Sequence, residues 1–312
     1  MAAGVTPLEH TVLSGGLPRA KAPLVLGSEG AGVVVNDGDP EFPAGTRVMF
    51  AGPYGVSEKG SYAEWLAVRR EHLCTIPDNI DDVSAAGLPV AYLTSNMSLS
   101  LAGFKPGQSV FAPAIGGSVG NAVTQLARAM GASHAISSTT SRAKAEQARA
   151  MGFEEVIDLS AERLQDGVRR ITGGYGADII IDAVGGELLG DALGTLAVSG
   201  SLTTLGYSAG RKSTIDVTDL IWKRPSIRTF RRGQADRGAD LPAEARRRCA
   251  SRSHRRASFW TRGAHALMRL RGRPRIAVSV PGGNEMSRWI QSVSFLVALI
   301  ILAAANKTKP SS

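Results

Sequence analysis

The stretch Ser109-Val-Phe-Ala-Pro-Ala-Ile-Gly-Gly-Ser-Val-Gly-Asn-Ala-Val-Thr-Gln-Leu-Ala-Arg128 decides the fold of this chain. An apolar run reaches a glycine-rich turn with the spacing Ala114-x-x-Gly117-x-x-Gly120 and then continues as a helical pattern. A strand, a tight turn and a helix N-terminus in this order can hold the pyrophosphate of a dinucleotide, because backbone N–H groups and the positive helix end face the anion. The residues predicted to form this site are Ala114, Gly116, Gly117, Ser118, Val119 and Gly120.

The sequence after this turn alternates short apolar runs with helical stretches. The runs start about 20–25 residues apart, which is the size of one strand–helix repeat with its loops. A glycine closes each of the first three helical stretches, as at many helix C-termini. The pattern predicts an α/β fold with a doubly wound parallel sheet of the Rossmann type. The expected strands are Val110–Ala112, His134–Ser137, Glu155–Asp158, Asp178–Asp182 and Ser201–Leu205, and the expected helices are Val119–Met130, Arg142–Met151, Ala161–Thr172 and Glu187–Ala197.

The residues after the second expected strand indicate which dinucleotide is bound. An Asp or Glu about 20 residues beyond the glycine turn binds the ribose 2′-hydroxyl of NAD, but Ser137-Ser-Thr-Thr-Ser-Arg-Ala-Lys144 contains no carboxylate. Hydroxyls with Arg and Lys suit a 2′-phosphate, so NADP(H) is favoured over NAD(H). Alternatively, these are solvated residues at a helix start with Thr140 or Ser141 as N-cap, and both roles are compatible. The candidate residues are Ser138, Thr139, Thr140, Arg142 and Lys144.

Four motifs precede the glycine turn. They are Gly27-Ser-Glu-Gly-Ala-Gly-Val-Val-Val35, Ala44-Gly-Thr-Arg-Val-Met-Phe50, Gly60-Ser-Tyr-Ala-Glu-Trp-Leu-Ala-Val68 and Leu88-Pro-Val-Ala-Tyr-Leu-Thr94. In this order and spacing the chain resembles the medium-chain dehydrogenase/reductase superfamily, in its zinc-independent quinone oxidoreductase (zeta-crystallin-like) branch. The resemblance runs from about residue 2 to about residue 230. It implies a GroES-like β-rich catalytic domain and a Rossmann domain, with the active site in the cleft between them.

The resemblance, together with the composition of the C-terminal quarter, predicts a division of the chain into four parts. The parts are a GroES-like domain at 1–95, an NADP-binding Rossmann domain at 96–230, an atypical Arg-rich segment at 231–275, and a closing strand with an apolar helix at 276–312. Relatives carry further residues ahead of the position that matches Met1, and those residues supply the first strands. We therefore expect an incomplete GroES-like domain with unpaired sheet edges and exposed apolar surface.

The residues present argue against a bound metal. Thr6 and Ser28 match the positions of the Cys and His ligands in zinc-dependent members, and hydroxyls are poor zinc ligands. The chain has only Cys74 and Cys249, too few for a four-Cys zinc lobe, and its five His residues show no metal-ligand spacing. Two scattered cysteines also give no disulfide framework, which fits a reducing, cytoplasmic environment.

The resemblance implies hydride transfer from NADPH to a small-molecule quinone or α,β-unsaturated carbonyl. Without zinc, hydrogen-bond donors have to polarise the carbonyl. Thr94 matches a family threonine near the nicotinamide, and Thr6 lies where many members have Asn before Pro. Tyr62 belongs to a shared motif in which a structural role is equally open, and Glu29 is expected to be structural. Further cofactor contacts are implied for Val184, Gly206, Tyr207 and Ser208.

The formal net charge of +9 arises in one segment. Residues 228–275 contain fifteen Arg, no Lys and three acidic residues, so the rest of the chain sums to −3. An Arg run favours acidic surfaces, but it contains no RNA-binding motif and little aromatic interleaving. We expect salt-dependent, sequence-independent binding and no specific nucleic-acid partner. An alternative hypothesis is a coding sequence read out of frame, which sequencing of the gene tests.

The Arg-rich segment also bears on assembly. By analogy with the family, the sixth Rossmann strand is expected within it, although its apolar periodicity is poor. The family pairs through this last strand, so the resemblance implies a homodimer, whereas the Arg-rich composition of the segment leaves a monomer as the alternative.

The last part of the chain is apolar. Residues 289–306 carry no charge, and the core Phe295–Ala305 is short for a membrane span, which needs about 20 residues. We expect a buried helix. A membrane anchor is an alternative that is not favoured, and appended sequence resembling a signal peptide is another.

Two functions of different classes follow from these observations. The first is an NADPH-dependent, zinc-independent reductase. The second is a catalytically impaired nucleotide-binding remnant of that family, with a basic tail that associates with nucleic acid or a membrane. The intact glycine turn favours the first, and the two atypical ends favour the second.

Overall fold

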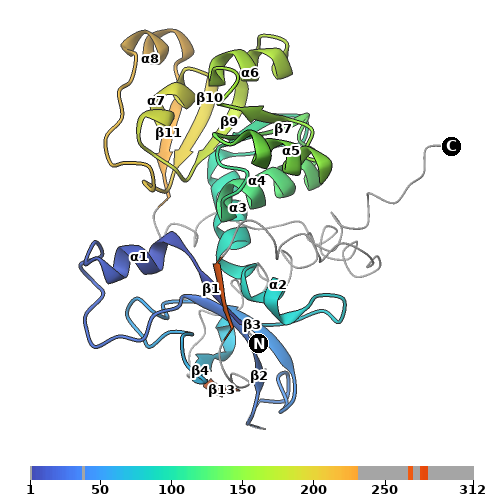
Figure 1. The fold of residues 1–312 in the computed structure, drawn as a ribbon, viewed down its shortest axis with the longest axis vertical. Helices are drawn as coiled ribbons and strands as arrows, with labels where there is room; N and C mark the ends of the chain where they lie inside the picture. Colours follow the sequence, from blue (N-terminus) through green and yellow to red (C-terminus); the bar gives the residue numbers. More distant parts are fainter. Residues whose placement is uncertain (1, 37–38, 231–265, 270–274, 280–312) are drawn as a thin grey trace, which may run out of the picture. The chain divides into compact units, whose positions relative to one another are not determined.

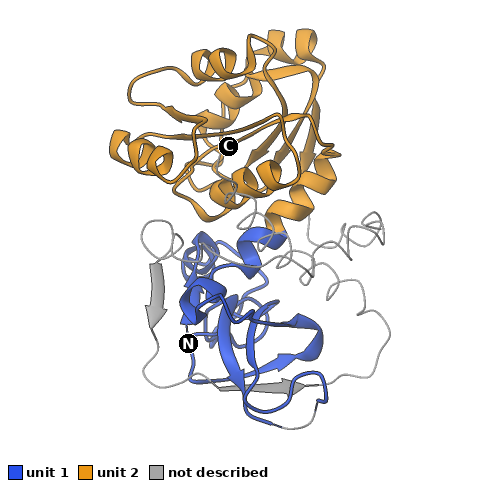
Figure 2. Ribbon diagram, turned by 90° about the vertical axis from the view of Figure 1, so that its right-hand side faces the viewer, with its two compact units in different colours: residues 1–93, 249–312 blue, residues 94–248 orange. Residues whose placement is uncertain are grey.

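The computed structural model describes residues 2–36, 39–230, 266–269 and 275–279 of the chain. The chain forms two compact units, which Figure 2 shows in different colours. Unit 1 comprises residues 1–93 with 249–312, and unit 2 comprises residues 94–248. The segments predicted to be Arg-rich and apolar, at 231–275 and 276–312, lie outside the described residues except for 266–269 and 275–279, so the roles expected for the undescribed parts stay predictions.

Unit 1 is built on a seven-stranded sheet with the order β12-β1-β2-β13-β4, while β3 pairs with β2 and with β5. Figure 1 labels β1, β2, β3, β4 and β13 of this sheet. Strand β2 is antiparallel to β1 and β3, and β13 runs parallel to β2 and β4. Residues of β2 and β3 are almost all buried, which explains their glycine-rich and apolar sequences. The strands are β1 (Ala2–Val5), β2 (Glu29–Val34), β3 (Arg47–Ala51), β4 (Trp65–Arg69), β5 (Leu73–Thr75), β12 (Ala266–Arg269) and β13 (Arg275–Ser279).

The core of unit 1 lies between this sheet and its connecting loops. Phe50 and Tyr54 pack edge to face with ring centroids 5.6 Å apart. They belong to a buried cluster completed by Val34, Phe42, Val48, Val68 and Leu73. The helical elements of this part of the chain are α1 (Pro7–Leu13), η1 (Arg70–His72), α2 (Asp82–Ala86) and α3 (Pro89–Ala102), of which α3 continues into unit 2.

Unit 2 is the predicted doubly wound parallel sheet, with the order β11-β10-β9-β6-β7-β8. Figure 1 labels β7, β9, β10 and β11 of this sheet. All neighbouring strands are parallel, and the order reverses direction between β6 and β9, where dinucleotides bind in such sheets. The strands are β6 (Ser109–Ala112), β7 (His134–Thr139), β8 (Val156–Asp158), β9 (Ala177–Asp182), β10 (Leu196–Thr204) and β11 (Ser226–Thr229).

The helices of unit 2 connect these strands in chain order. They are α4 (Ser118–Ala129), α5 (Arg142–Ala150), α6 (Leu164–Thr172), α7 (Glu187–Leu193) and α8 (Val217–Lys223). The three predicted terminal glycines, Gly131, Gly152 and Gly173, all have positive φ, as expected where the chain leaves a helix. The α/β fold class predicted from the alternating pattern is therefore confirmed.

Two predicted helix boundaries are wrong. Helix α6 begins at Leu164 instead of Ala161, because the carboxylate and carbonyl of Asp158 hold the intervening residues in a turn. Helix α7 ends at Leu193 instead of Ala197, because the Thr195 hydroxyl donates to the Ala192 carbonyl and β10 starts at Leu196.

The expected position of the sixth Rossmann strand is also corrected. Strand β11 ends at Thr229, before most of the Arg-rich segment, and Ile227 pairs in register with Leu202 of β10. Strand β11 was not predicted because it is an exposed edge strand. Its four residues include one large apolar residue, so the sequence shows no apolar run there.

Candidate functional site

The turn between β6 and α4 has the geometry of a phosphate-binding loop. Ala114 takes a left-handed conformation with φ +64°, and its carbonyl accepts from the Gly117 N–H at 2.8 Å. The Ile115 N–H donates to the Ser138 carbonyl at 2.9 Å, which joins the turn to the end of β7. A Cβ on Gly120 would lie closer than 3.0 Å to the Pro113 and Ala114 carbonyl oxygens. Only glycine therefore fits at this position while the turn stays in place.

The first turn of α4 offers backbone donors to an anion. Gly117 is the N-cap and provides no side-chain hydrogen bond to the helix. The first N–H groups of a helix have no partner within it, and a twelve-residue helix adds a positive N-terminal potential. The N–H groups at Ser118, Val119 and Gly120 are therefore suited to phosphate oxygens.

The residues at the end of β7 divide into buried and exposed hydroxyls. Ser138 and Thr139 are buried, and Thr140 is exposed. Ser141 is the N-cap of α5, and its hydroxyl oxygen accepts from the Lys144 N–H at 3.5 Å. Of the two N-cap candidates in the sequence, Ser141 is thus the one used. The Ser138 hydroxyl is buried and has no hydrogen-bond partner among the described residues.

The two cations of this cluster have different surroundings. Arg142 forms an exposed ion pair with Glu146 at 3.3 Å, which offsets part of its charge. Lys144 forms no ion pair with any residue that the structure describes, and it lies against Gly116. A Cβ on Gly116 would be 3.6 Å from Lys144 Cδ and 3.9 Å from its Nζ. The structure therefore brings Lys144, from the first turn of α5, to the glycine turn.

A buried carboxylate organises the loop after β9. Asp182 is fully buried, and its two oxygens accept from the N–H groups of Val184 and Gly185 and from the Thr204 hydroxyl, at 3.0–3.1 Å. The Val184 carbonyl then accepts from the Ala209 N–H at 2.8 Å.

The loops after β9 and β10 thus lie side by side. Gly206 approaches Ala183 so closely that a Cβ would be under 3.0 Å from its carbonyl. The Arg211 guanidinium lies over the Tyr207 ring, with its central carbon 5.2 Å from the ring centroid. Tyr207 and Ser208 are both exposed. The predicted residues Val184, Gly206, Tyr207 and Ser208 therefore lie on two adjacent loops.

In unit 1 the carboxylate of Glu9 joins Thr6 to Ser28. Glu9 Oε2 accepts from the Thr6 N–H at 2.8 Å and from the Thr6 hydroxyl at 2.6 Å. Glu9 Oε1 accepts from the Ser28 N–H at 3.0 Å and from the Ser28 hydroxyl at 2.7 Å. Glu9 and Ser28 are buried, and Thr6 is half-buried. The single hydroxyl proton of Thr6 is therefore already donated to Glu9.

The neighbouring Glu29 and Tyr62 are also held by the protein. Glu29 is fully buried, and its Oε2 accepts from the Val90 N–H at 2.8 Å. Burial raises the pKa of Glu29 to about 8, reinforced by the charge of Glu9. The Tyr62 hydroxyl donates to the Gly4 carbonyl at 3.1 Å, and burial followed by the charges of Glu9 and Glu29 raises its pKa to about 12. The proton of Tyr62 is thus engaged as well.

Thr94 differs from the other two predicted catalytic residues. It lies half-buried on α3, and its hydroxyl makes no hydrogen bond within the described part of the chain, while its carbonyl accepts from the Ser98 hydroxyl at 2.7 Å. The next residue, Ser95, donates through its hydroxyl to the Val119 carbonyl at 3.4 Å. This contact brings the Thr94 segment to the start of α4 within unit 2.

The donor set at Thr6 and Ser28, the positions expected to match the zinc ligands, does not fit zinc. Thr6 and Ser28 offer hydroxyls that already bind Glu9, whereas zinc takes thiolate, imidazole or carboxylate ligands. Across residues 2–36, 39–230, 266–269 and 275–279, no group of three or more His, Cys, Asp or Glu residues could hold a metal ion. Cys74 is buried as a free thiol, and burial raises its pKa to about 12.

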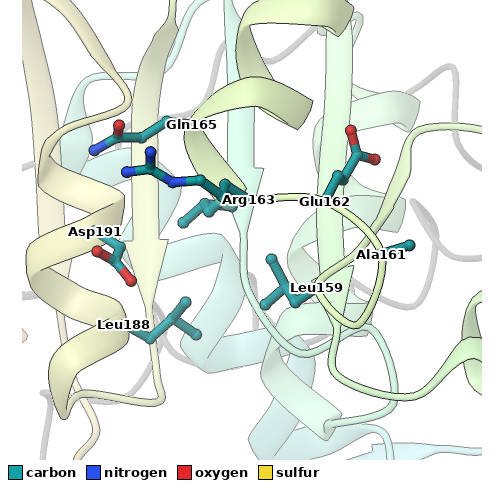
Figure 3. Close-up of a pocket in the computed structure, with 8 residues that line it drawn as sticks. Leu159, Ala161, Glu162, Arg163, Gln165, Leu188 and Asp191 are labelled. Atoms are coloured by element: carbon teal, nitrogen blue, oxygen red, sulfur yellow. The ribbon is translucent and has the colours of Figure 1, made fainter.

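Unit 2 has a separate cavity of about 380 Å³ between the loop after β8 and helices α6 and α7 (Figure 3). Leu159 and Leu188 form apolar parts of its wall, and Arg163, Gln165 and Asp191 add polar groups. Its lining includes none of the residues predicted to bind the cofactor.

Sequence reasoning missed Glu9 and the role of Asp182. The signal for Glu9 was present, because Thr6-x-x-Glu9 is the pattern of a capping box, and α1 indeed has one. The contact from Glu9 to Ser28 had no such signal, since it joins residues 19 positions apart.

Among residues 2–36, 39–230, 266–269 and 275–279, no helix is long and apolar enough to cross a membrane, and the predicted apolar segment 289–306 lies outside these ranges.

Comparison with known proteins identifies the family. A family model for zinc-binding dehydrogenases matches residues 118–247, and the model for the alcohol dehydrogenase GroES-like domain matches residues 1–78. A quinone oxidoreductase from Pseudomonas aeruginosa is 32% identical over 239 residues, which cover 73% of this chain and 72% of that protein. Quinone oxidoreductase-like protein 2 from Rattus norvegicus is 31% identical over 65% of this chain, and the chain spans only 58% of its length.

Solved structures agree with this assignment. The quinone oxidoreductase from Thermus thermophilus, described together with its NADPH complex, superposes with a TM-score of 0.62 at 27% identity, over 76% of this chain and 71% of that one. The parallel sheet of unit 2, the GroES-like match of unit 1 and these relatives point to one family. The chain belongs to the medium-chain dehydrogenase/reductase superfamily and is quinone oxidoreductase-like.

Proposed function

We propose that this protein is an NADPH-dependent, zinc-independent oxidoreductase that transfers hydride to a quinone or an α,β-unsaturated carbonyl. The observation that carries the proposal is the glycine turn before the uncapped start of α4, with Lys144 lying against Gly116. Relatives named as quinone oxidoreductases, and a neighbour described with NADPH, support the same chemistry. The activity of the whole protein and its substrate are part of this proposal.

The cofactor contacts follow from the two loop clusters of unit 2. The turn from Ala114 to Gly120 would hold the pyrophosphate, and Lys144 with the hydroxyls of Ser138, Thr139 and Thr140 would bind the 2′-phosphoribose. The adjacent loops with Val184 and residues 206–208 would flank the nicotinamide. Arg142 contributes less to phosphate binding than Lys144, because Glu146 offsets part of its charge.

The cofactor, when bound, supplies the hydride. This chain's own residues have to orient the acceptor and stabilise the negative charge that develops on its carbonyl oxygen. Thr94 is suited to donate to that oxygen, because its hydroxyl proton is not used elsewhere in the described part of the chain. Thr6 and Tyr62 already donate to Glu9 and to the Gly4 carbonyl. They are therefore assigned to shaping the acceptor site, and they would polarise a carbonyl only after breaking these bonds.

The second candidate function is a nucleotide-binding protein without catalysis. The engaged protons of Thr6 and Tyr62 favour it, because they leave few donors for an acceptor.

The open edge of β11 separately supports assembly with a second copy. Its four residues are all exposed, and among the described residues only β10 pairs with it, so the same edges of two copies can meet antiparallel about a two-fold axis.

An assay of NADPH oxidation by a simple para- or ortho-quinone distinguishes the two functions. The loss of NADPH absorbance measures the oxidation. The purified full chain should consume NADPH only when both the cofactor and the quinone are present. Saturable NADPH binding without quinone-dependent consumption would instead establish the non-catalytic function. Absence of both binding and turnover would refute the assignment of the glycine turn as well.

A further inference from the structure

The carboxylate of Glu9 has a complete set of hydrogen bonds from two separate segments. Four donors reach it: the backbone N–H and the hydroxyl of Thr6, and the same two groups of Ser28, at 2.6–3.0 Å. A carboxylate offers about four lone-pair sites, so Glu9 has none left for a further donor. Such charge-assisted bonds are stronger than bonds between neutral groups, and their strength increases in a buried environment.

The arrangement links parts of unit 1 that the sequence keeps apart. Thr6 is the N-cap of α1, and its bond with Glu9 closes the capping box of that helix. Ser28 lies directly before β2, and the next residue, Glu29, accepts from the Val90 N–H at the start of α3. Glu9 thus holds the Thr6 turn against the dipeptide Ser28-Glu29, and Glu29 is itself hydrogen-bonded to the start of α3.

Thr6 and Ser28 are also the two residues that the family resemblance places at the metal-ligand positions of zinc-dependent members. In this chain, neither hydroxyl suits zinc, and both face one carboxylate. A negatively charged side chain with four protein donors joins these positions directly. The hydroxyls of both residues donate to Glu9, and Thr6 Oγ1 also accepts from the Leu8 N–H at 3.2 Å, so Thr6 Oγ1 keeps only one acceptor site.

We propose that Glu9 is a positioning residue that orients the Thr6 turn and Ser28 for the hydride acceptor, through hydrogen bonds that join the two positions without a metal. The inference rests on the proposed oxidoreductase function. It assigns Glu9 no contact with the substrate. It predicts that loss of the carboxylate affects the acceptor step and leaves the cofactor site of unit 2 intact.

The test compares Glu9→Gln and Glu9→Asp with the exposed control Glu64→Gln in the full-length protein. Glutamine has the same shape but replaces one acceptor oxygen by an NH₂ group, which faces a backbone N–H that cannot turn away, while the neighbouring hydroxyl can rotate to accept. Aspartate keeps the charge but is shorter by one methylene. Ser28→Ala, which removes one of the four bonds and keeps the charge, provides a milder variant if Glu9→Gln fails to fold.

The first measurement is amide hydrogen exchange in segments 2–13 and 25–34, which requires no catalytic activity. In Glu9→Gln, exchange at Thr6 and Ser28 should rise by about tenfold or more over Glu64→Gln, since charged hydrogen bonds are lost. Ser28→Ala should shift exchange in the same direction by less. Exchange equal to that of the Glu64→Gln control would overturn the inference, even if the wild-type protein proved inactive.

The second measurement separates positioning from simple stabilisation. Glu9→Gln should lower kcat with a quinone by about tenfold or more while the Kd for NADPH stays unchanged, and Glu9→Asp should recover part of the loss. An unchanged kcat with raised exchange would show a purely structural role and overturn the positioning role. If the wild-type protein consumes no NADPH with any quinone, the proposed function fails, and the exchange result still decides whether Glu9 joins the two segments.

Discussion

Lys144 lies against Gly116, so an ammonium from the start of α5 reaches the turn that precedes α4. A Cβ on Gly116 would be 3.6 Å from Lys144 Cδ and 3.9 Å from Nζ. Arg142, two residues earlier, is instead paired with Glu146. The two cations that the sequence offers for a 2′-phosphate are therefore unequal, and Lys144 is the better candidate.

Lys144→Ala should weaken NADPH binding by about 10- to 100-fold and leave NADH binding nearly unchanged, because one charged hydrogen bond to the 2′-phosphate is lost. Fluorescence titration with both cofactors measures the difference. Arg142→Ala is the matched control and should have a smaller effect. Equal loss of NADPH and NADH affinity in Lys144→Ala would contradict a role in 2′-phosphate recognition.

Gly120→Val should abolish cofactor binding, because its side chain would collide with the Pro113 and Ala114 carbonyl oxygens and displace the turn. Gly116→Ala is a milder variant of the same turn and should cost less affinity, since its new methyl group meets only the flexible Lys144 side chain at ordinary contact distance. Calorimetric titration with NADPH compares the two, and thermal unfolding checks that each variant folds. Retained affinity in a folded Gly120→Val protein would show that the turn does not hold the pyrophosphate.

The buried carboxyl of Glu29 should make the protein less stable as the pH rises. Its pKa is raised from 4.5 to about 8, so the native state keeps a proton that the unfolded chain releases. The free energy of unfolding should therefore fall between about pH 4.5 and pH 8, by at most about 1.4 kcal/mol per pH unit, and level off above. Urea unfolding across this range should show a flatter profile for Glu29→Gln than for wild type. The same profile in both proteins would rule out the shifted pKa, and Glu64→Gln controls for a change of exposed charge.

Thr94→Val should lower kcat for quinone reduction by about a hundredfold, because it removes the hydroxyl that is left to stabilise the developing oxyanion. Thr94→Ser keeps the hydroxyl and should retain most of the activity.

Tyr62→Phe should lower the free energy of unfolding by about 1 kcal/mol through loss of the hydrogen bond to the Gly4 carbonyl, and it should lower kcat less than Thr94→Val does. Steady-state kinetics with unfolding curves separates these effects, and a greater loss of kcat in Tyr62→Phe would reverse the two assignments.

Ile227→Lys should convert a dimer into a monomer, because it places a charge on the exposed edge strand β11, where Ile227 is 49% exposed. Light scattering after gel filtration gives the mass of each form. Tyr175→Lys, at a position that is 85% exposed and away from this strand, is the control. A wild-type monomer, or a dimer that survives Ile227→Lys, would exclude pairing through β11.

The sequence alone predicted the fold of unit 2 and the nature of its turn. Buried parallel strands read as apolar runs, as in Ile179-Ile-Ile181, and glycines close three of the helices, so local preference and tertiary structure agree there. Strand β11 was missed for the opposite reason, because an edge strand needs no apolar run. The poor fit of Thr6 and Ser28 to zinc was also readable, since it depends only on the chemistry of side chains.

Only the tertiary structure decided which groups meet. The bonds from Glu9 to Ser28 and from Val90 to Glu29 cross 19 and 61 positions, and the contact of Lys144 with Gly116 joins two different loops. No local pattern encodes these contacts, because they arise when strands and helices pack and bring distant polar groups into one buried region. The same packing determines that Thr6 and Tyr62 have their protons engaged, whereas the Thr94 hydroxyl is not used within the described residues. The sequence thus determined what kinds of groups are present, and burial together with hydrogen bonding across the fold decided which of them can act.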